Sequence, residues 1–100
     1  MLLYNMTIAI DRDAEQTWKS WMTEQQIPAV EATGIFSKAM FFRVVTHDDP
    51  VTSSYCLQLF AEDITALNRW LDQHAKSFLA EMQRRYPDKH AVFQTLLEQC

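Results

Sequence analysis

Few side chains in this sequence have the chemistry of a catalytic or binding group, and they lie far apart along the chain. His74 could accept or donate a proton near neutral pH, because an imidazole titrates in that range. Arg43 could hold the carboxylate of an anionic ligand, since a planar guanidinium suits that task. Each also has a plain structural alternative, as a half-buried helix histidine or a charged residue at the end of a strand.

A second set of residues could line a ligand pocket. Asn5 and Tyr55 could supply hydrogen bonds among apolar walls, and Trp18 could stand near such a cavity. The polar residues could equally pair across strands or across a dimer interface. The deciding observation is whether His74, Arg43 and Asn5 converge on one closed cavity. If they point apart, an enzyme hypothesis has no common site.

The sequence contains few residues that would indicate a metal site or a reactive thiol. The run His47-Asp48-Asp49 lies in an expected turn, and residues so close together do not form a closed metal site by themselves. Cys56 has no cationic neighbour in sequence that would favour a thiolate. Cys56 and Cys100 are interpreted as free thiols in a reducing compartment. The sequence therefore predicts no metal site and no cofactor.

Composition narrows the class of protein. The 100 residues, 48% of them hydrophobic, predict one domain over positions 1–100. The net charge of −4 leaves no basic surface for nucleic acid. No apolar stretch approaches the roughly 20 residues of a membrane-spanning helix. The N-terminus lacks the basic start of a signal peptide, so we expect a cytoplasmic protein that does not bind a membrane.

The clearest element is a helix predicted over Ile64–Arg85, capped by Asp63 and ending before Pro87. At about 100° per residue, one apolar stripe collects Leu67, Leu71, Phe78 and Met82, among others. Trp70 lies beside this stripe, where it either packs against the first helix or contacts a partner.

The N-terminal half predicts a strand followed by helices. Residues 2–10 alternate between apolar and mixed positions, as in a strand with one buried face. A helix should begin at Ala14, capped by Asp13, and attach to the sheet through its tryptophans. Pro28 should interrupt it, and it can equally start a short second turn over Pro28–Thr33, with Gly34 just after that turn, where a positive φ is wanted.

Three further strands are expected. Residues 35–46 are apolar on both faces, which predicts a strand covered on both sides. Residues 51–61 alternate, and residues 91–95 form a last short strand, followed by a tail over 96–100 that could be helical. The order βαββαβ predicts an α+β, ferredoxin-like fold, with a four-stranded antiparallel sheet and two helices on one face.

The other face of this sheet raises the question of assembly. It should carry Asn5, Thr7, Cys56, Gln58 and Phe60, a mixture of polar and aromatic groups. Left bare, these would expose aromatic area in a small domain, so a second chain packed sheet against sheet is the economical cover. We therefore expect a symmetric homodimer, with Gln58, Phe60 and Trp70 as candidate interface residues.

Several separated segments together resemble a family of small bacterial proteins of unknown function. They are Tyr4-Asn5-Met6-Thr7, Trp18-Lys19-Ser20-Trp21-Met22, Ile27-Pro28-Ala29-Val30, Thr33-Gly34, His74-Ala75, and the run from Asp88-Lys89 to Leu97. The resemblance implies a dimeric α+β barrel, a class that includes small monooxygenases, isomerases and stress-response proteins with a cavity in each subunit. Gln26 stands where the family pattern has a histidine, which weakens the case for imidazole chemistry at that point.

Two functions follow. The first is a homodimeric binding or assembly module that takes up a small apolar or anionic molecule, or a protein partner, without chemistry. The alternative is a cofactor-free enzyme of the monooxygenase or isomerase type that uses Trp18, His74 or Tyr55 near a cavity. Because the candidates are scattered singly rather than grouped in a motif, the first is preferred.

Overall fold

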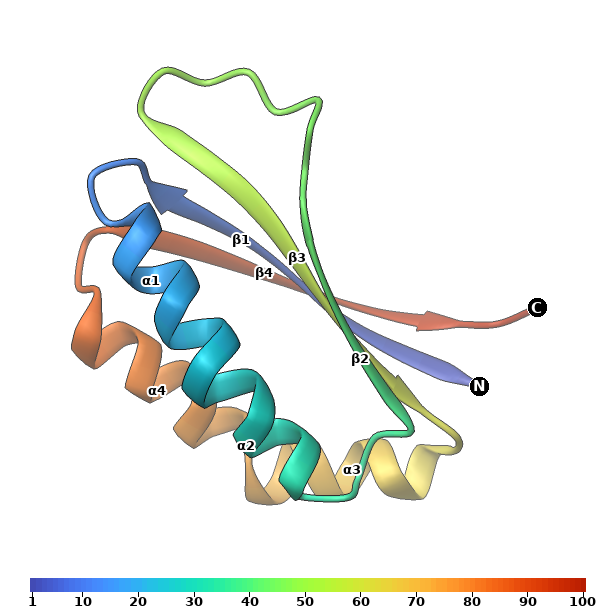
Figure 1. Cartoon of the computed structure of the whole chain (residues 1–100). Coiled ribbons are helices and arrows are strands. Elements are labelled where there is room, and N and C mark those ends of the chain that lie inside the picture. Colours follow the sequence, from blue (N-terminus) through green and yellow to red (C-terminus); the bar gives the residue numbers. More distant parts are fainter.

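The computed structural model describes residues 1–100 and confirms the ferredoxin-like βαββαβ fold. Its four strands form one antiparallel sheet in the order β2-β3-β1-β4. All helices lie on one face of the sheet, and both chain termini lie at the same end of it (Figure 1). The elements are β1 (Leu2–Asp11), α1 (Glu15–Trp21), η1 (Met22–Gln26), α2 (Ile27–Ala32), β2 (Lys38–Arg43), β3 (Thr52–Ala61), α3 (Ile64–Gln73), α4 (Ala75–Arg85) and β4 (His90–Glu98).

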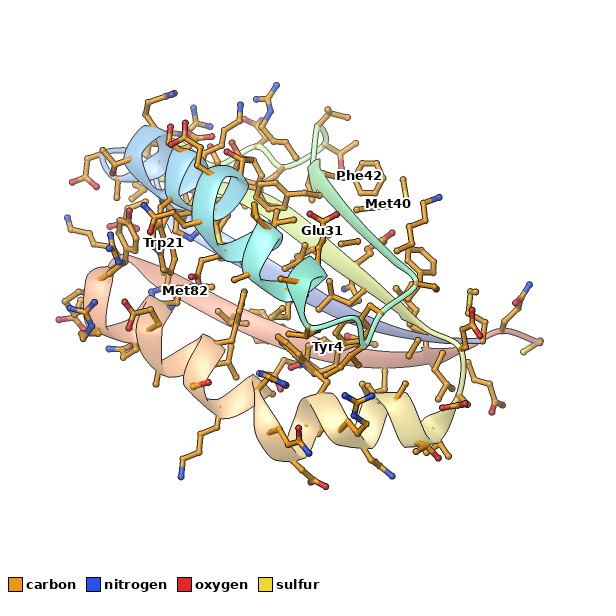
Figure 2. All side chains as sticks on the ribbon, turned by 60° about the horizontal axis from the view of Figure 1, so that its bottom comes forward. Tyr4, Trp21, Glu31, Met40, Phe42 and Met82 are labelled. Carbon is orange, nitrogen blue, oxygen red and sulfur yellow. The ribbon has the colours of Figure 1, made fainter.

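The core lies between the helices and the two central strands. Alternate residues of β1 and β3 point toward the helices because side chains in a strand repeat every two positions. Figure 2 shows three of the buried side chains, Tyr4, Trp21 and Met82, between the sheet and the helices. The side chains with no more than 2% exposure are Tyr4, Met6, Ile8, Ile10, Trp18, Met22, Leu57, Leu59, Leu67, Trp70 and Met82, together with the small Ala61.

The first helical segment differs from the prediction in two details. Pro28 does not interrupt the helix, because the π-helical turn η1 precedes it and Ile27 donates to the carbonyl of Met22. The wider turn places Pro28 in the first turn of α2, where its missing N–H costs little. Asp13 does not cap the helix either. Its carboxylate instead accepts a hydrogen bond from Lys89 at 2.9 Å.

The expected helix over residues 64–85 is two helices that meet at His74, whose φ of −130° breaks the regular geometry. Asp63 caps α3 as predicted. The break turns the buried face of α3 by about a quarter of a turn relative to that of α4, so one helical wheel cannot describe both. Trp70 is therefore a core residue with 2% exposure, whereas Leu71 is 37% exposed. The predictions of a core Leu71 and a surface contact for Trp70 are both wrong.

No helix here is long and apolar enough to cross a membrane.

Both edge strands depart from their predicted bounds. β2 is confined to Lys38–Arg43 and is covered on one side only, since Met40 and Phe42 point away from the helices (Figure 2). The tail over 96–100 is not helical. β4 continues to Glu98 because β1 begins at Leu2. The backbone N–H and C=O groups of the tail therefore pair with those of β1. Gly34 has the predicted positive φ, +69°.

The open face of the sheet, turned away from the helices, carries three rows of side chains across all four strands. The strand register aligns them as Phe42–Cys56–Thr7–Phe93, Met40–Gln58–Asn5–Thr95 and Lys38–Phe60–Leu3–Leu97. Phe93 is 69% exposed, and Phe42 and Leu97 are each almost half exposed. The middle row is largely polar, and the rows beside it carry the aromatic and aliphatic groups.

The phase of α3 can be tested with two adjacent alanine substitutions. Trp70→Ala should lower the free energy of unfolding by about 3–5 kcal/mol, because it leaves a large cavity among Tyr4, Phe36 and Phe78. Leu71→Ala should cost less than about 1 kcal/mol, because its side chain is partly in solvent. Urea denaturation followed by circular dichroism measures both. The reverse order of costs would contradict the break at His74.

Candidate functional site

A hydroxyl–carboxylate cluster joins the start of α1 to β3. The carboxylate of Glu15 accepts a hydrogen bond from Ser53 Oγ at 2.9 Å and one from the Tyr55 hydroxyl at 2.7 Å. Ser53 and Tyr55 are two residues apart on β3, so both side chains reach the helix face of the sheet. Both carboxylate oxygens are thus engaged, and the tyrosine ring is held in one orientation.

A polar pocket of about 410 Å³ opens beside this cluster. Its lining residues are Arg12, Glu15, Gln16, Lys19, Arg43 and Tyr55. Arg43 stands opposite Tyr55 in the register of β2 and β3. Two of the predicted ligand-binding residues, Arg43 and Tyr55, therefore meet here.

Trp18 lies behind this pocket rather than in it. Its side chain has no solvent exposure and does not line the pocket, so the prediction that it contacts a ligand is wrong. Its ring packs edge-on against Tyr55 at 5.0 Å and tilted against Phe41 at 5.7 Å between centroids. Trp18 thus supports the inner side of Tyr55, which fixes the position of the pocket wall.

The electrostatics of the cluster oppose proton transfer at neutral pH. Burial, together with the hydrogen bond to Glu15 and its negative charge, raises the pKa of Tyr55 to about 12. The hydrogen bond from Tyr55 holds the pKa of Glu15 below its usual range, which burial only partly offsets. Tyr55 therefore stays protonated and Glu15 stays ionised. The arrangement suits binding better than acid–base catalysis.

A second cavity, the helix groove, lies between α2 and the junction of α3 with α4. It has a volume of about 210 Å³, with Val30, Trp70 and Phe78 among its apolar walls and Gln26, Thr33 and His74 among its polar ones. The His74 ring stacks on Trp70, with 5.7 Å between centroids and 18° between planes. The break between α3 and α4 therefore places an imidazole over a core indole at the groove.

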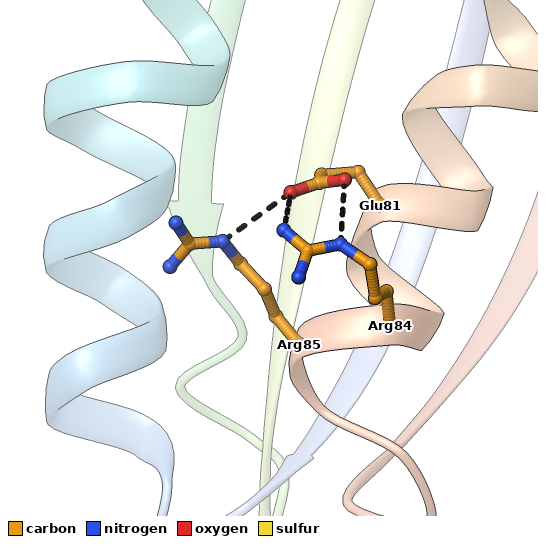
Figure 3. A network of polar contacts seen from close by, with 3 residues as sticks. All are labelled: Glu81, Arg84 and Arg85. Carbon is orange, nitrogen blue, oxygen red and sulfur yellow. Dashed lines mark hydrogen bonds and ion pairs between the residues drawn. The ribbon is translucent and has the colours of Figure 1, made fainter.

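Glu81 lines the helix groove, and arginines of the same helix, α4, balance the charge of its carboxylate. Glu81 accepts hydrogen bonds from the guanidinium of Arg84 and forms an ion pair with Arg85 at 3.5 Å (Figure 3). The hydrogen bonds from Arg84 lower the pKa of Glu81. Arg85 also lies over the Trp21 ring at 5.1 Å, which links α4 to α1. The groove therefore presents little net charge to a ligand.

Asn5 lies in neither cavity. It is at the centre of the open face, where its amide nitrogen donates to Thr7 Oγ1 at 3.2 Å and its buried oxygen has no hydrogen-bond partner. Gln58 and Phe60 lie on the same face, as predicted from the alternation of β3. His74, Arg43 and Asn5 thus belong to three different places. They do not converge on one closed cavity.

The sequence did not identify four of the six residues that line the polar pocket. Arg12 follows the first strand, where the sequence indicates only a turn, Gln16 is expected as the capping partner of Asp13, and Glu15 and Lys19 lie away from the apolar face of the helix. A usable signal was present, because Arg12, Glu15, Gln16 and Lys19 fall within two turns around the start of α1. What the sequence did not reveal is that Arg43 and Tyr55 would lie against those turns.

Fold and cavities together define the class of this protein as a ferredoxin-like α+β domain with an uncovered sheet face. The chain belongs to the family described as domain of unknown function DUF4286, whose model matches residues 1–100. This confirms the resemblance to an uncharacterised family. No protein with a curated description matches the sequence.

Solved structures agree on the fold. HapK from Hahella chejuensis has a TM-score of 0.70 at 14% identity, covering 100% of this chain and 93% of its own. A mutant of MhuD, with two manganese protoporphyrin IX molecules bound per active site, has a TM-score of 0.70 at 15% identity, covering 99% and 94%. A dimeric ferredoxin-like protein from an uncultured marine organism has a TM-score of 0.59 at 8% identity, covering 97% and 93%. At these identities, the likeness concerns the fold alone.

The coupling between Glu15 and the β3 hydroxyls predicts a pH-dependent contribution to stability. Because the pKa of Glu15 is lower in the folded chain than in the unfolded one, its ionised form stabilises the fold above the unfolded value of about 4.3. This contribution is lost as the pH falls through the folded value. The difference in unfolding free energy between the native chain and Glu15→Gln should therefore be largest near pH 6 and shrink toward pH 3, as urea titrations would measure. A constant difference would contradict the lowered pKa.

Proposed function

We propose that this protein is a homodimeric small-molecule-binding module, assembled through the open face and carrying one helix groove in each subunit. The observation that carries this proposal is the stacked Trp70–His74 pair in the wall of a largely apolar cavity. Ligand pockets are typically apolar clefts with a few placed polar groups. The groove has this composition, with His74, Thr33 and Gln26 as the polar groups.

The open face supports self-association. Phe93, Phe42 and Leu97 expose apolar area around the polar row of Asn5 and Gln58, which is an arrangement that a flat partner surface can cover. Amide groups carry both donors and acceptors, so two copies of the same polar row can pair about a twofold axis. The buried, unpartnered oxygen of Asn5 would then gain a donor. A dimeric protein of this fold provides a precedent.

The expected ligand of the helix groove is a small, largely apolar molecule with one or two hydrogen-bonding groups. Aromatic and aliphatic walls favour such a molecule, and the charge of Glu81 is already balanced by Arg84 and Arg85. A mutant of MhuD binds manganese protoporphyrin IX in its active site, so a protein of this fold is able to bind a ligand with a large aromatic ring system. The setting we propose is the reducing cytoplasm of a bacterium, where the free thiols of Cys56 and Cys100 would persist.

Binding is preferred over the cofactor-free monooxygenase or isomerase alternative. That alternative needs convergent groups with proton-transfer chemistry, whereas His74 and Tyr55 line separate cavities and Trp18 is enclosed in the core. The high pKa of Tyr55 also removes it as a proton carrier at neutral pH.

The dimer can be tested with two charged substitutions on one strand. Phe93 and Leu96 are both exposed on β4, but their side chains point to opposite faces of the sheet. Phe93→Glu should convert a dimer into a monomer, because it places a charge inside the proposed interface, whereas Leu96→Glu should leave the dimer intact. Light scattering at micromolar concentration measures the mass. A native chain that runs as a monomer would contradict the proposal.

The helix groove can be tested by blocking it. Ala29 lines the groove, and Ala80 is an exposed alanine of α4 outside it. Native mass spectrometry of the protein purified from its own host should show a retained small molecule. Ala29→Trp should lose that molecule by filling the space, and Ala80→Trp should keep it. A ligand that survives Ala29→Trp, or native protein that never retains one, would contradict binding in the groove.

A further inference from the structure

We propose that the polar pocket between α1, β2 and β3 is a second binding site, specific for a small metabolite with a multiply charged oxyanion, either a phosphate or a pair of carboxylates. This pocket is separate from both the helix groove and the open face, and most of the charges that line it are cationic.

The pocket concentrates positive charge in an acidic protein. Arg12, Lys19 and Arg43 line it against the single carboxylate of Glu15, while the whole chain carries a net charge of −4. Arg12 directly follows β1, Lys19 is on α1 and Arg43 ends β2, so the fold places Arg43 at the same pocket as two cations that are distant from it in sequence. Like charges that line one pocket repel one another, and an anion between them relieves that repulsion.

None of these three cations forms an ion pair within the chain. The ion pairs of the chain involve Arg84, Arg85 and Lys89 with their acidic partners. The side chains of Lys19 and Arg43 form no hydrogen bond, and Arg12 donates only to the backbone carbonyl of Asp49 at 2.7 Å. The Asp49 carboxylate lies close enough to Arg12 to interact with it, but it accepts hydrogen bonds from the N–H groups of Val51 and Thr52. Lys19 and Arg43 therefore have donors available for a ligand.

Glu15 offsets only part of the positive charge of the pocket. Both of its oxygens accept hydroxyl hydrogen bonds, from Ser53 and Tyr55, and the charges of Arg12 and Arg43 help to lower its pKa, but it forms no ion pair with any of the cations. Its charge still repels an anion. A ligand is therefore expected to bind through the unpaired donors of Arg43 and Lys19, with the amide of Gln16 as a further donor.

The size and donors of the pocket select the ligand class. About 410 Å³ is enough for a small metabolite rather than a bare ion. Guanidinium groups bind phosphate or carboxylate oxygens through two parallel hydrogen bonds, and a lysine adds a point charge. A singly charged anion engages too few of these donors to overcome the negative charge of Glu15. A doubly or more highly charged oxyanion can contact Arg43 and Lys19 together.

The test is isothermal titration calorimetry of the full chain with pyrophosphate and, separately, citrate, at neutral pH and constant ionic strength. At least one probe should bind, and the tighter one distinguishes phosphate from carboxylate recognition. Arg43→Gln should weaken that binding about tenfold or more, because it removes a charge-assisted pair of hydrogen bonds. Lys19→Gln should give a smaller loss. Arg69→Gln, an exposed arginine of α3 outside the pocket, should bind like the native chain.

Three outcomes would overturn this proposal. One is the absence of binding by both probes at millimolar concentration. Another is equal binding to Arg43→Gln and Arg69→Gln, which would indicate attraction by overall charge. The third is an equal rise in melting temperature from sodium chloride and from pyrophosphate at the same ionic strength. The Lys19 side chain is exposed and forms no hydrogen bond or ion pair in the fold, so Lys19→Gln keeps the test informative should Arg43→Gln fail to fold.

Discussion

The structure depends on the one-sided burial of its sheet. Along β1 and β3, every second side chain is packed under the helices, and the intervening ones are left on the open face. A one-residue shift of β1 against its neighbours would turn Met6 and Ile8 outward, so the register is strongly determined. The same register aligns the rows of the open face. The hydrophobic constraint that builds the core therefore also shapes the surface available for a partner.

Two side-chain clusters connect this core to the cavities. Tyr4, Phe36 and Phe78 surround Trp70, and His74 stacks on the same indole where α3 ends. At the other end of the core, Trp18 packs behind Tyr55. The Tyr55 hydroxyl is hydrogen-bonded to Glu15 of α1. Each cavity thus has one wall that is part of the core. A rigid wall of this kind presents a ligand with a preformed surface, which lowers the entropic cost of binding.

The separation of these surfaces bears on function. The helix groove lies among η1, α2, α3 and α4, whereas the polar pocket and the open face lie on opposite sides of β2 and β3. The candidate residues His74, Arg43 and Asn5 are divided among these three surfaces. An enzyme concentrates its reacting groups, whereas a binding protein can distribute its surfaces. Ferredoxin-like neighbours with little sequence identity share the frame, and function on such a frame is decided by the local site rather than by the fold.

The sequence by itself determined the order of elements, the buried faces of β1 and β3, the Asp63 cap and the bend at Gly34, because each depends on neighbours within a few residues. It also indicated Arg43 and Tyr55. Only the tertiary structure decided that the long helix divides at His74 and buries Trp70, that Pro28 is accommodated by a π-helical turn, and that the tail pairs with β1. The polar pocket likewise required the packing of α1 against β2 and β3. The burial of Trp70, the pairing of the tail with β1 and the polar pocket depend on contacts between distant segments, which local periodicity does not encode.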